Sequence, residues 1–258
     1  MKISIVINCD TRPQRDEFGG TNLQGVVNED FLTQGVANKI AFFNGFEKEV
    51  IIHVDEHLPL SKDAFNYLQL ASDTLVIRKH TDEPLFNDWN YMRALQLATG
   101  DIVCHVDQDC NLFANSKDSV QELISYLETF DYISYPSHCS PNAVYDDSFN
   151  YRWVSTRFFM CKRDKLNFSE IIKCLNSYDY FAETYKPSRI LHWLEHILGN
   201  ICFSNVFYPP IDYEKLLIFC WENYEKYTLQ RLNNQTYKEV KDWVYSKGGV
   251  FYPNQVRI

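Results

Sequence analysis

The feature that most constrains the fold is a short stretch, residues 94–110, with the sequence ALQLATGDIVCHVDQDC. A helical pattern ends at Gly100, a residue that favours the left-handed turn found after many helices. The apolar run 102–106 follows, and its length and β-branched content predict a buried strand. Asp107 and Asp109 come directly after this run. The stretch therefore predicts two carboxylates at the carboxyl end of a buried strand, where open α/β sheets bind ligands.

A carboxylate pair in this position suits a hard divalent cation. Two oxygen ligands can hold Mg²⁺ or Mn²⁺, shared with a diphosphate. The D-x-D triplet alone is a weak signal, because acidic chains contain it by chance in solvated loops. The predicted strand and the helix, glycine and aspartate before it favour a metal site at Asp107 and Asp109.

The order of the predicted elements indicates an α/β fold. Strands are predicted at residues 3–8, 49–54, 74–78 and 102–106, and helices at 29–44, 61–72 and 87–97. Alternation of this kind predicts a doubly wound, mainly parallel central sheet flanked by helices. Residues 14–25 are polar and contain glycine, so we expect a long loop there. The sequence has no glycine-rich dinucleotide or P-loop motif. A metal ion that bridges the protein and the diphosphate would take over the role of a glycine-rich phosphate-binding loop.

The second half of the chain is less regular. The patterns predict a helix at 117–129, strands at 132–135 and 153–162, and a helix at 188–199 that Gly199 ends. A further strand is expected between Gly199 and Pro209. The aromatic and charged tail, 213–247, is expected to form two helices.

Several of these phrases, in this order, resemble the GT-A glycosyltransferases, especially the family-two-like group. The phrases are Asn90-x-x-Arg93-Ala94, then ATGD at 98–101, then VDQD at 106–109. The phrase FMCKRDKL at 159–166 also looks like the acceptor side of these enzymes, although Ser155-Thr156-Arg157 stands where the family often has two glycines. The resemblance implies one GT-A-like α/β domain over residues 1–258. Its parts would be a nucleotide-sugar half (1–115), an acceptor half (116–211) and a helical tail (212–258).

The resemblance also implies roles for single residues. Asp55 would contact the nucleobase, and a carboxylate that accepts from a pyrimidine N–H favours uracil or thymine, hence a UDP-sugar. Asp109 would hold the metal, and Asp107 the metal or the ribose. The other expected donor-binding residues are Asp10, Arg12 and Arg93. Each of these side chains also has a plain structural interpretation, as a polar loop residue, a helix cap or a surface ion pair.

A second group of polar residues lies in the predicted helix 188–199, with the sequence HWLEH at 192–196. The resemblance implies that Glu195 is the catalytic base that deprotonates an acceptor hydroxyl, with inversion at the sugar carbon. His196 stands where the family more often has aspartate. The alternative is a zinc metallopeptidase, because H-x-x-E-H places His192 and His196 on one helix face as zinc ligands. Its third ligand would be Glu214, Glu222 or Glu225. Two surface histidines on an amphipathic helix would give the same pattern.

Composition limits the classes of function. The chain has 258 residues, 45% of them hydrophobic, and a net charge of -9, which argues against nucleic acid as a partner. No apolar run approaches the roughly 20 residues of a transmembrane helix, although peripheral membrane contact stays open. The eight cysteines form no C-x-x-C pair, and with no signal peptide predicted we expect reduced thiols in a cytoplasmic protein.

The expected function is sugar transfer that depends on Mn²⁺ or Mg²⁺, from a nucleotide-sugar to a hydroxyl of a glycan, lipid or protein acceptor. A non-catalytic nucleotide-sugar-binding module is a further alternative. The sequence leaves open the sugar, the acceptor, the oligomeric state and the choice between inverting and retaining chemistry.

Overall fold

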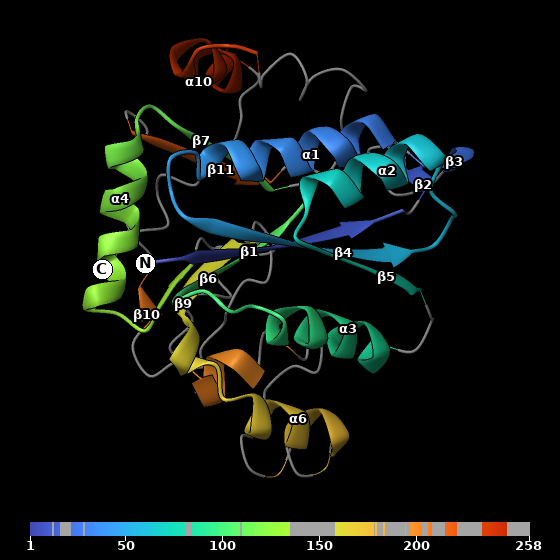
Figure 1. The fold of residues 1–258 in the computed structure, drawn as a ribbon, viewed down its shortest axis with the longest axis vertical. Coiled ribbons are helices and arrows are strands. Elements are labelled where there is room, and N and C mark those ends of the chain that lie inside the picture. Colours follow the sequence, from blue (N-terminus) through green and yellow to red (C-terminus); the bar gives the residue numbers. More distant parts are fainter. Residues whose placement is uncertain are drawn as a thin grey trace.

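The computed structural model describes fourteen parts of the chain. These are residues 1–11, 13–15, 22–27, 29–80, 84–108, 110–134, 158–177, 179, 183, 194, 197–202, 206–207, 215–220 and 234–246. Within them, helices cover both faces of one central sheet (Figure 1). The predicted α/β class, with a mainly parallel sheet flanked by helices, is therefore confirmed.

The central sheet has seven strands in the order β10-β8-β9-β6-β1-β4-β5. Its parallel core consists of β1 (Ile3–Asp10), β4 (Lys48–Glu56), β5 (Thr74–Lys79) and β6 (Ile102–Asp107). β9 (Phe158–Lys162) runs antiparallel to β6 and to β8 (Tyr132–Ser134), and β10 (Val206–Phe207) is parallel to β8. Because β9 alone is reversed, six strands end at the same edge of the sheet.

The helices pack on opposite faces of this sheet. α1 (Glu29–Phe42) and α2 (Lys62–Ala71) cover one face, and α3 (Pro84–Gln96) and α6 (Phe168–Asn176) lie on the other (Figure 1). Strand β1 supplies both hydrophobic cores, with Ile5 and Ile7 in one and Val6 in the other. A strand buried on both faces explains why residues 3–8 are almost continuously apolar. None of the described helices has the length and apolar character needed to cross a membrane.

Two expectations about loops and tail were wrong in part. Residues 14–25 were expected to form a loop, but β2 (Pro13–Arg15) pairs antiparallel with β3 (Asn22–Val27). The tail contains helix α10 (Tyr237–Ser246), but residues 216–220 form strand β11 and not a helix. β11 pairs antiparallel with β7 (Cys110–Ala114). The strand at 216–220 was missed because its partner β7 is distant in the chain, and pairing between distant segments leaves no periodic signal within either segment.

The other elements follow the predicted order. α4 (Lys117–Ser125) and η1 (Tyr126–Glu128) occupy the helix expected at 117–129. Leu198–Cys202 form a π-helix, so Gly199 does not end the helix. The strand expected between Gly199 and Pro209 is present as β10, residues 206–207, and does not include residues 200–202. Gly45, which follows α1, has φ of 81° and supplies a left-handed turn after the helix.

Gly100 is required for a reason that differs from the predicted one. Its backbone is not left-handed, since Gly45 is the glycine with positive φ among the described residues. A Cβ on Gly100 would instead lie 2.7 Å from the Lys2 carbonyl oxygen and 2.8 Å from the Ser4 nitrogen. The Gly100 amide also donates to Glu49 at 3.1 Å. Burial would raise the pKa of Glu49, but hydrogen bonds from Lys2, Ser4 and Thr99 outweigh it and hold the pKa at about 2. Gly100 thus allows the close approach of two chain segments.

Candidate functional site

Carboxylates gather where three neighbouring parallel strands end. Asp10, Asp55 and Asp107 stand at or next to the last positions of β1, β4 and β6. Asp10 lies opposite Asp55 in the sheet register, and Asp107 lies opposite Asn8. Asp55 is buried, and Asp10 and Asp107 are half-buried. The structure therefore brings three of the predicted donor-binding residues to one edge, which Figure 1 shows at the arrowheads of β1 and β4.

Gln108, the middle residue of D-Q-D, ties the turn to the end of β1. Its backbone amide donates to the Asn8 carbonyl at 2.8 Å. Its side-chain oxygen accepts from the Asp10 amide at 3.2 Å, and its side-chain nitrogen donates to the Asp10 carbonyl at 3.3 Å. These bonds fix the backbone beside Asp107 before any ligand binds.

Helix α1 supports the same turn from below. Gly35, Asn38 and Lys39 lie at spacings of three and four residues, so they share one helix face. A Cβ on Gly35 would lie 2.7 Å from the Gln108 carbonyl oxygen, and the Lys39 ammonium donates to that oxygen at 2.8 Å. Asn38 exchanges two hydrogen bonds of 2.9 Å with the backbone of Leu112. Lys39 is fully buried, so its ammonium group lies against the backbone of Gln108, directly after Asp107.

Sequence reasoning missed this face of α1. A signal was present, because a glycine inside a helical pattern often marks the close approach of another backbone. Two polar residues followed it on the apolar side of the helix. The partner of Lys39 is Gln108, 69 residues away in the chain, and the partner of Asn38 is Leu112 of β7, 74 residues away. No local pattern links these residues.

Asp55 is in contact with two histidines that the sequence analysis did not select. Its Oδ2 lies 2.8 Å from Nδ1 of His80 and 3.5 Å from Nε2 of His57. The two imidazole rings stack with a centroid separation of 3.6 Å and an interplanar angle of 22°. Its other oxygen, Oδ1, is buried and has no hydrogen-bond partner among the described residues. Asp55 thus presents one occupied oxygen and one that needs a donor.

A buried polar layer lies below these strand ends, on the face that α3 covers. His53 is fully buried between β1 and β5, with its ring edge-on to Tyr91 at 5.6 Å. Neither ring nitrogen of His53 has a hydrogen-bond partner among the described residues, and the side chain of Asn90 has none there either. Burial lowers the pKa of His53 to about 4, so the imidazole is neutral at physiological pH.

The low pKa of His53 predicts a loss of stability on acidification. The folded-state pKa of about 4 lies below the ordinary value of 6.5, so the unfolded chain binds more protons between these values. The contribution is fully present above pH 6.5 and is lost as pH falls toward 4, by up to about 3 kcal/mol. Urea unfolding of wild type and His53→Leu at pH 7, 6 and 5 should show a shallower decline for the variant. Parallel declines would contradict this role for His53.

The remaining predicted site residues divide into two groups. Arg93 is exposed in the last turn of α3, with its guanidinium over the Trp89 ring at 5.6 Å. The structure therefore shows no contact between Arg93 and the three aspartates. The role of Arg93 in binding the nucleotide-sugar stays a prediction. Arg12, Asp109 and Glu195 lie outside the described residues, as do the other members of the zinc alternative, His192, His196, Glu214, Glu222 and Glu225.

The described residues also include a cavity and six buried cysteines, and neither offers a better candidate for the functional site than the carboxylate edge. A cavity of about 570 Å³ lies at the opposite edge of the sheet, where Gly100, Asp101 and Arg163 are among its lining residues. Burial raises the pKa of the Cys202 thiol to about 12 and that of Cys174 to about 11. The six cysteines with described side chains are buried and unbonded, as expected, and buried neutral thiols are poor nucleophiles.

Comparison with known proteins gives structural likeness without a sequence match. No family model matches the chain, and no curated protein matches it. Among solved structures, it is similar to the galactosyltransferase LgtC in complex with donor and acceptor sugar analogs. The TM-score is 0.45 at 12% identity, over 80% of this chain and 72% of LgtC.

Two further solved structures show a similar degree of likeness. TarS 1–349 from S. aureus has a TM-score of 0.46 at 13% identity, over 80% of this chain and 57% of that one. The apo bifunctional glycosyltransferase WbbM has a TM-score of 0.46 at 13% identity, over 81% and 38%. The matched region is thus less than two thirds of the length of TarS 1–349 and of WbbM.

Proposed function

We propose that this protein is a glycosyltransferase that uses a nucleotide diphosphate sugar and a divalent metal ion. The observation that carries the proposal is the carboxylate edge, where Asp10, Asp55 and Asp107 end three adjacent parallel strands. The carboxyl edge of a parallel sheet is the place where α/β proteins bind nucleotides. The order of the D-Q-D, ATGD and Asn90-x-x-Arg93 phrases, which resembles the GT-A enzymes, supports the same function.

The residues at this edge fit a metal-held diphosphate. Asp107 offers a half-buried carboxylate on a turn that Gln108 and Lys39 fix, and Asp109 would be the second oxygen ligand. Mn²⁺ or Mg²⁺ prefers such oxygen ligands, and when bound it would neutralise the charge that develops on the departing diphosphate. Arg12 is proposed to bind the phosphates, and the resemblance to the GT-A enzymes supports Arg93 as a further donor-binding residue.

Asp55 is proposed to select the base. Its Oδ1 is buried and lacks a partner among the described residues, and leaving such an acceptor unsatisfied costs free energy. The N3–H of uracil or thymine would satisfy it, which favours a UDP-sugar donor. Asp10 lies directly opposite Asp55 on the neighbouring strand β1. It is proposed to accept a hydrogen bond from the base or the ribose.

The transfer step is assigned to Glu195. Its carboxylate would take the proton of an acceptor hydroxyl while the hydroxyl oxygen forms a bond to the anomeric carbon. The bond from that carbon to the diphosphate breaks, and the electron pair leaves with the diphosphate. Attack from the opposite face inverts the configuration. A glycan, lipid or protein could supply the hydroxyl.

Release of the nucleoside diphosphate tests the transfer itself. The protein should release UDP from at least one UDP-sugar when Mn²⁺ and a mixture of glycan, lipid and peptide hydroxyl acceptors are present. EDTA should stop the release, and Glu195→Gln should lower it while UDP binding is kept. If the protein binds UDP tightly and in a metal-dependent manner but forms no UDP from any UDP-sugar, it is a non-catalytic binding module and not a transferase.

A further inference from the structure

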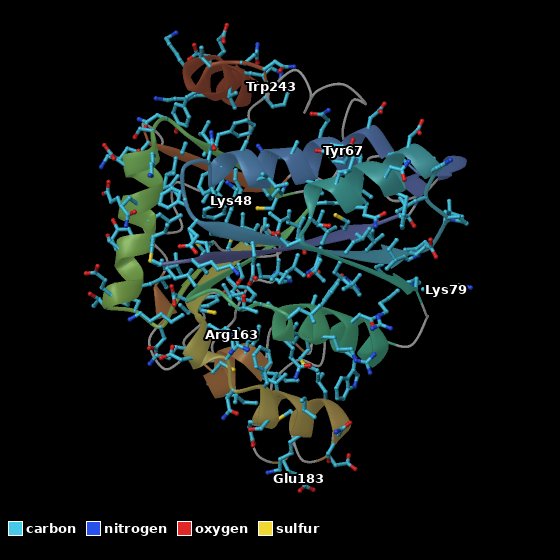
Figure 2. All side chains as sticks on the ribbon, in the orientation of Figure 1. Lys48, Tyr67, Lys79, Arg163, Glu183 and Trp243 are labelled. Carbon is cyan, nitrogen blue, oxygen red and sulfur yellow. The ribbon has the colours of Figure 1, made fainter. Side chains whose placement is uncertain are left out.

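A second group of metal-binding side chains lies beside the proposed donor site. Among the described residues, Asp55, His57 and His80 form the one group of three whose potential ligand atoms all lie within 4.8 Å of one another. They come from the carboxyl ends of β4 and β5, near Lys79, which Figure 2 labels at the end of β5. The D-x-D metal uses other residues, and the proposed function gives a role to Asp55 but none to His57 or His80.

The spacing of the three side chains fits a small ion. In a tetrahedral zinc site with bonds of about 2.05 Å, neighbouring ligand atoms are about 3.3 Å apart. The separation between Asp55 Oδ2 and His57 Nε2 is 3.5 Å, already close to that value. His80 Nδ1 lies 2.8 Å from the same oxygen, a hydrogen-bond distance. Exchange of the shared proton for a metal ion would lengthen this separation by about half an ångström. One imidazole would also turn out of the stack, because a metal ion lies close to the plane of each ring that binds it.

The backbone around these ligands is already held in place. The Thr11 hydroxyl oxygen accepts from the amides of His57 and Leu58, both at 2.9 Å, and donates to the Leu58 carbonyl at 2.7 Å. The His80 amide donates to the Glu56 carbonyl at 2.9 Å. Thr11 is fully buried. Ligands on a fixed backbone bind a metal without a large ordering cost.

Burial and charge also favour a cation here. The Asp55 side chain is 7% exposed, whereas His57 and His80 are 18% and 25% exposed. A buried carboxylate is stabilised by a positive charge, and its Oδ1 has no partner among the described residues. One divalent ion bound here would neutralise the carboxylate and could also accept the nitrogen lone pairs of both imidazoles.

We propose that Asp55, His57 and His80 form a transition-metal site that binds Zn²⁺ or a similar ion. Two imidazoles and one carboxylate select borderline ions over Mg²⁺ and Mn²⁺, which prefer oxygen ligands. Three protein ligands leave a fourth position open for water or another group. The site does not depend on the proposed function. However, an ion bound to Asp55 would compete with the uracil base for this carboxylate and would weaken UDP binding.

The test is a titration of the full-length protein with ZnCl₂ by calorimetry, in excess Mg²⁺ and without nucleotide. Wild type should bind one equivalent more tightly than His57→Ala and His80→Ala, by about tenfold to a hundredfold. Co²⁺ should give the visible absorption of a four-coordinate site in wild type only. Asp107→Asn is the control, because loss of the D-x-D carboxylate should leave Zn²⁺ binding unchanged. Both alanine variants keep the backbone amides that Thr11 and Glu56 bind, and their melting in EDTA reports whether they fold.

A second control separates this site from the H-x-x-E-H alternative. The double variant His192→Ala/His196→Ala should bind Zn²⁺ as wild type does. Absence of Zn²⁺ binding by wild type, or equal affinity in wild type and both single-histidine variants, would overturn the proposal. Loss of binding in the double variant alone would also overturn it and assign the zinc to residues 192–196. None of these outcomes depends on nucleotide binding, so they are independent of the proposed glycosyl transfer.

Discussion

Replacing Asp107 with asparagine is expected to weaken metal-dependent donor binding strongly while the fold survives. The amide has the size of the carboxylate but lacks the charge that binds a divalent ion. The backbone next to it stays fixed, because the Gln108 amide donates to the Asn8 carbonyl and not to Asp107. We expect UDP affinity in Mn²⁺ to fall by on the order of a hundredfold or more, equivalent to about 2.7 kcal/mol. Calorimetric titration with UDP and Mn²⁺ measures it.

Asp101→Asn is the matched control for this experiment. Asp101 precedes the same strand at its opposite end, where it is exposed and accepts from the Lys2 amide at 2.8 Å. An asparagine can still accept that bond, and UDP affinity should not change. Equal UDP affinity in Asp107→Asn and wild type would remove Asp107 from the proposed metal site.

Gly35→Ala is expected to reverse the usual sign of a glycine substitution within a helix. Alanine normally stabilises a helix interior by roughly 0.5–1 kcal/mol relative to glycine. Here the new Cβ would lie 2.7 Å from the Gln108 carbonyl oxygen, so either α1 or the D-Q-D turn must move. Overpacking of this kind costs about 1–3 kcal/mol. Urea unfolding should show the loss of stability, and UDP affinity in Mn²⁺ should fall with it because the turn carries Asp107.

Ala41→Gly on the same helix gives the ordinary cost of a glycine for comparison. Ala41 is exposed, and this variant should lose at most about 1 kcal/mol and keep wild-type UDP affinity. If Gly35→Ala were more stable than wild type, or if it bound UDP normally, α1 would not be the support of the D-Q-D turn.

Most of the first half of the fold could be predicted because each element carries its own local signal. The apolar runs that became β1, β4 and β6 are buried on both faces, so their sequences show it directly. Gly45 ends α1 through its own left-handed backbone. Gly100 was correctly selected but for the wrong reason, because the atoms that exclude a side chain there belong to Lys2 and Ser4. Such contacts between distant segments cannot be read from one segment.

The same distinction applies to the candidate site. Asp10, Asp55 and Asp107 could be predicted as neighbours because parallel strands joined by helices end at the same edge. The contact of His80 with Asp55 could not, since His80 is 25 residues away and meets Asp55 only through the pairing of β4 with β5. The contacts of Gly35 and Lys39 in α1 with Gln108 were missed for the same reason. The useful signals would have been polar residues directly after two strands and polar residues on an apolar helix face.

The central claim is that the carboxylate edge binds a nucleotide diphosphate sugar together with a metal ion. Thermal melting of the protein with UDP-, GDP- and dTDP-sugars, each with Mn²⁺, with Mg²⁺ and with EDTA, tests it most directly. A ligand at about a hundred times its dissociation constant adds roughly 2.7 kcal/mol of stability, which is an easily measured shift. We predict a shift that requires both a uridine or thymidine nucleotide and the metal ion. No shift with any donor, or an equal shift in EDTA, would contradict the claim.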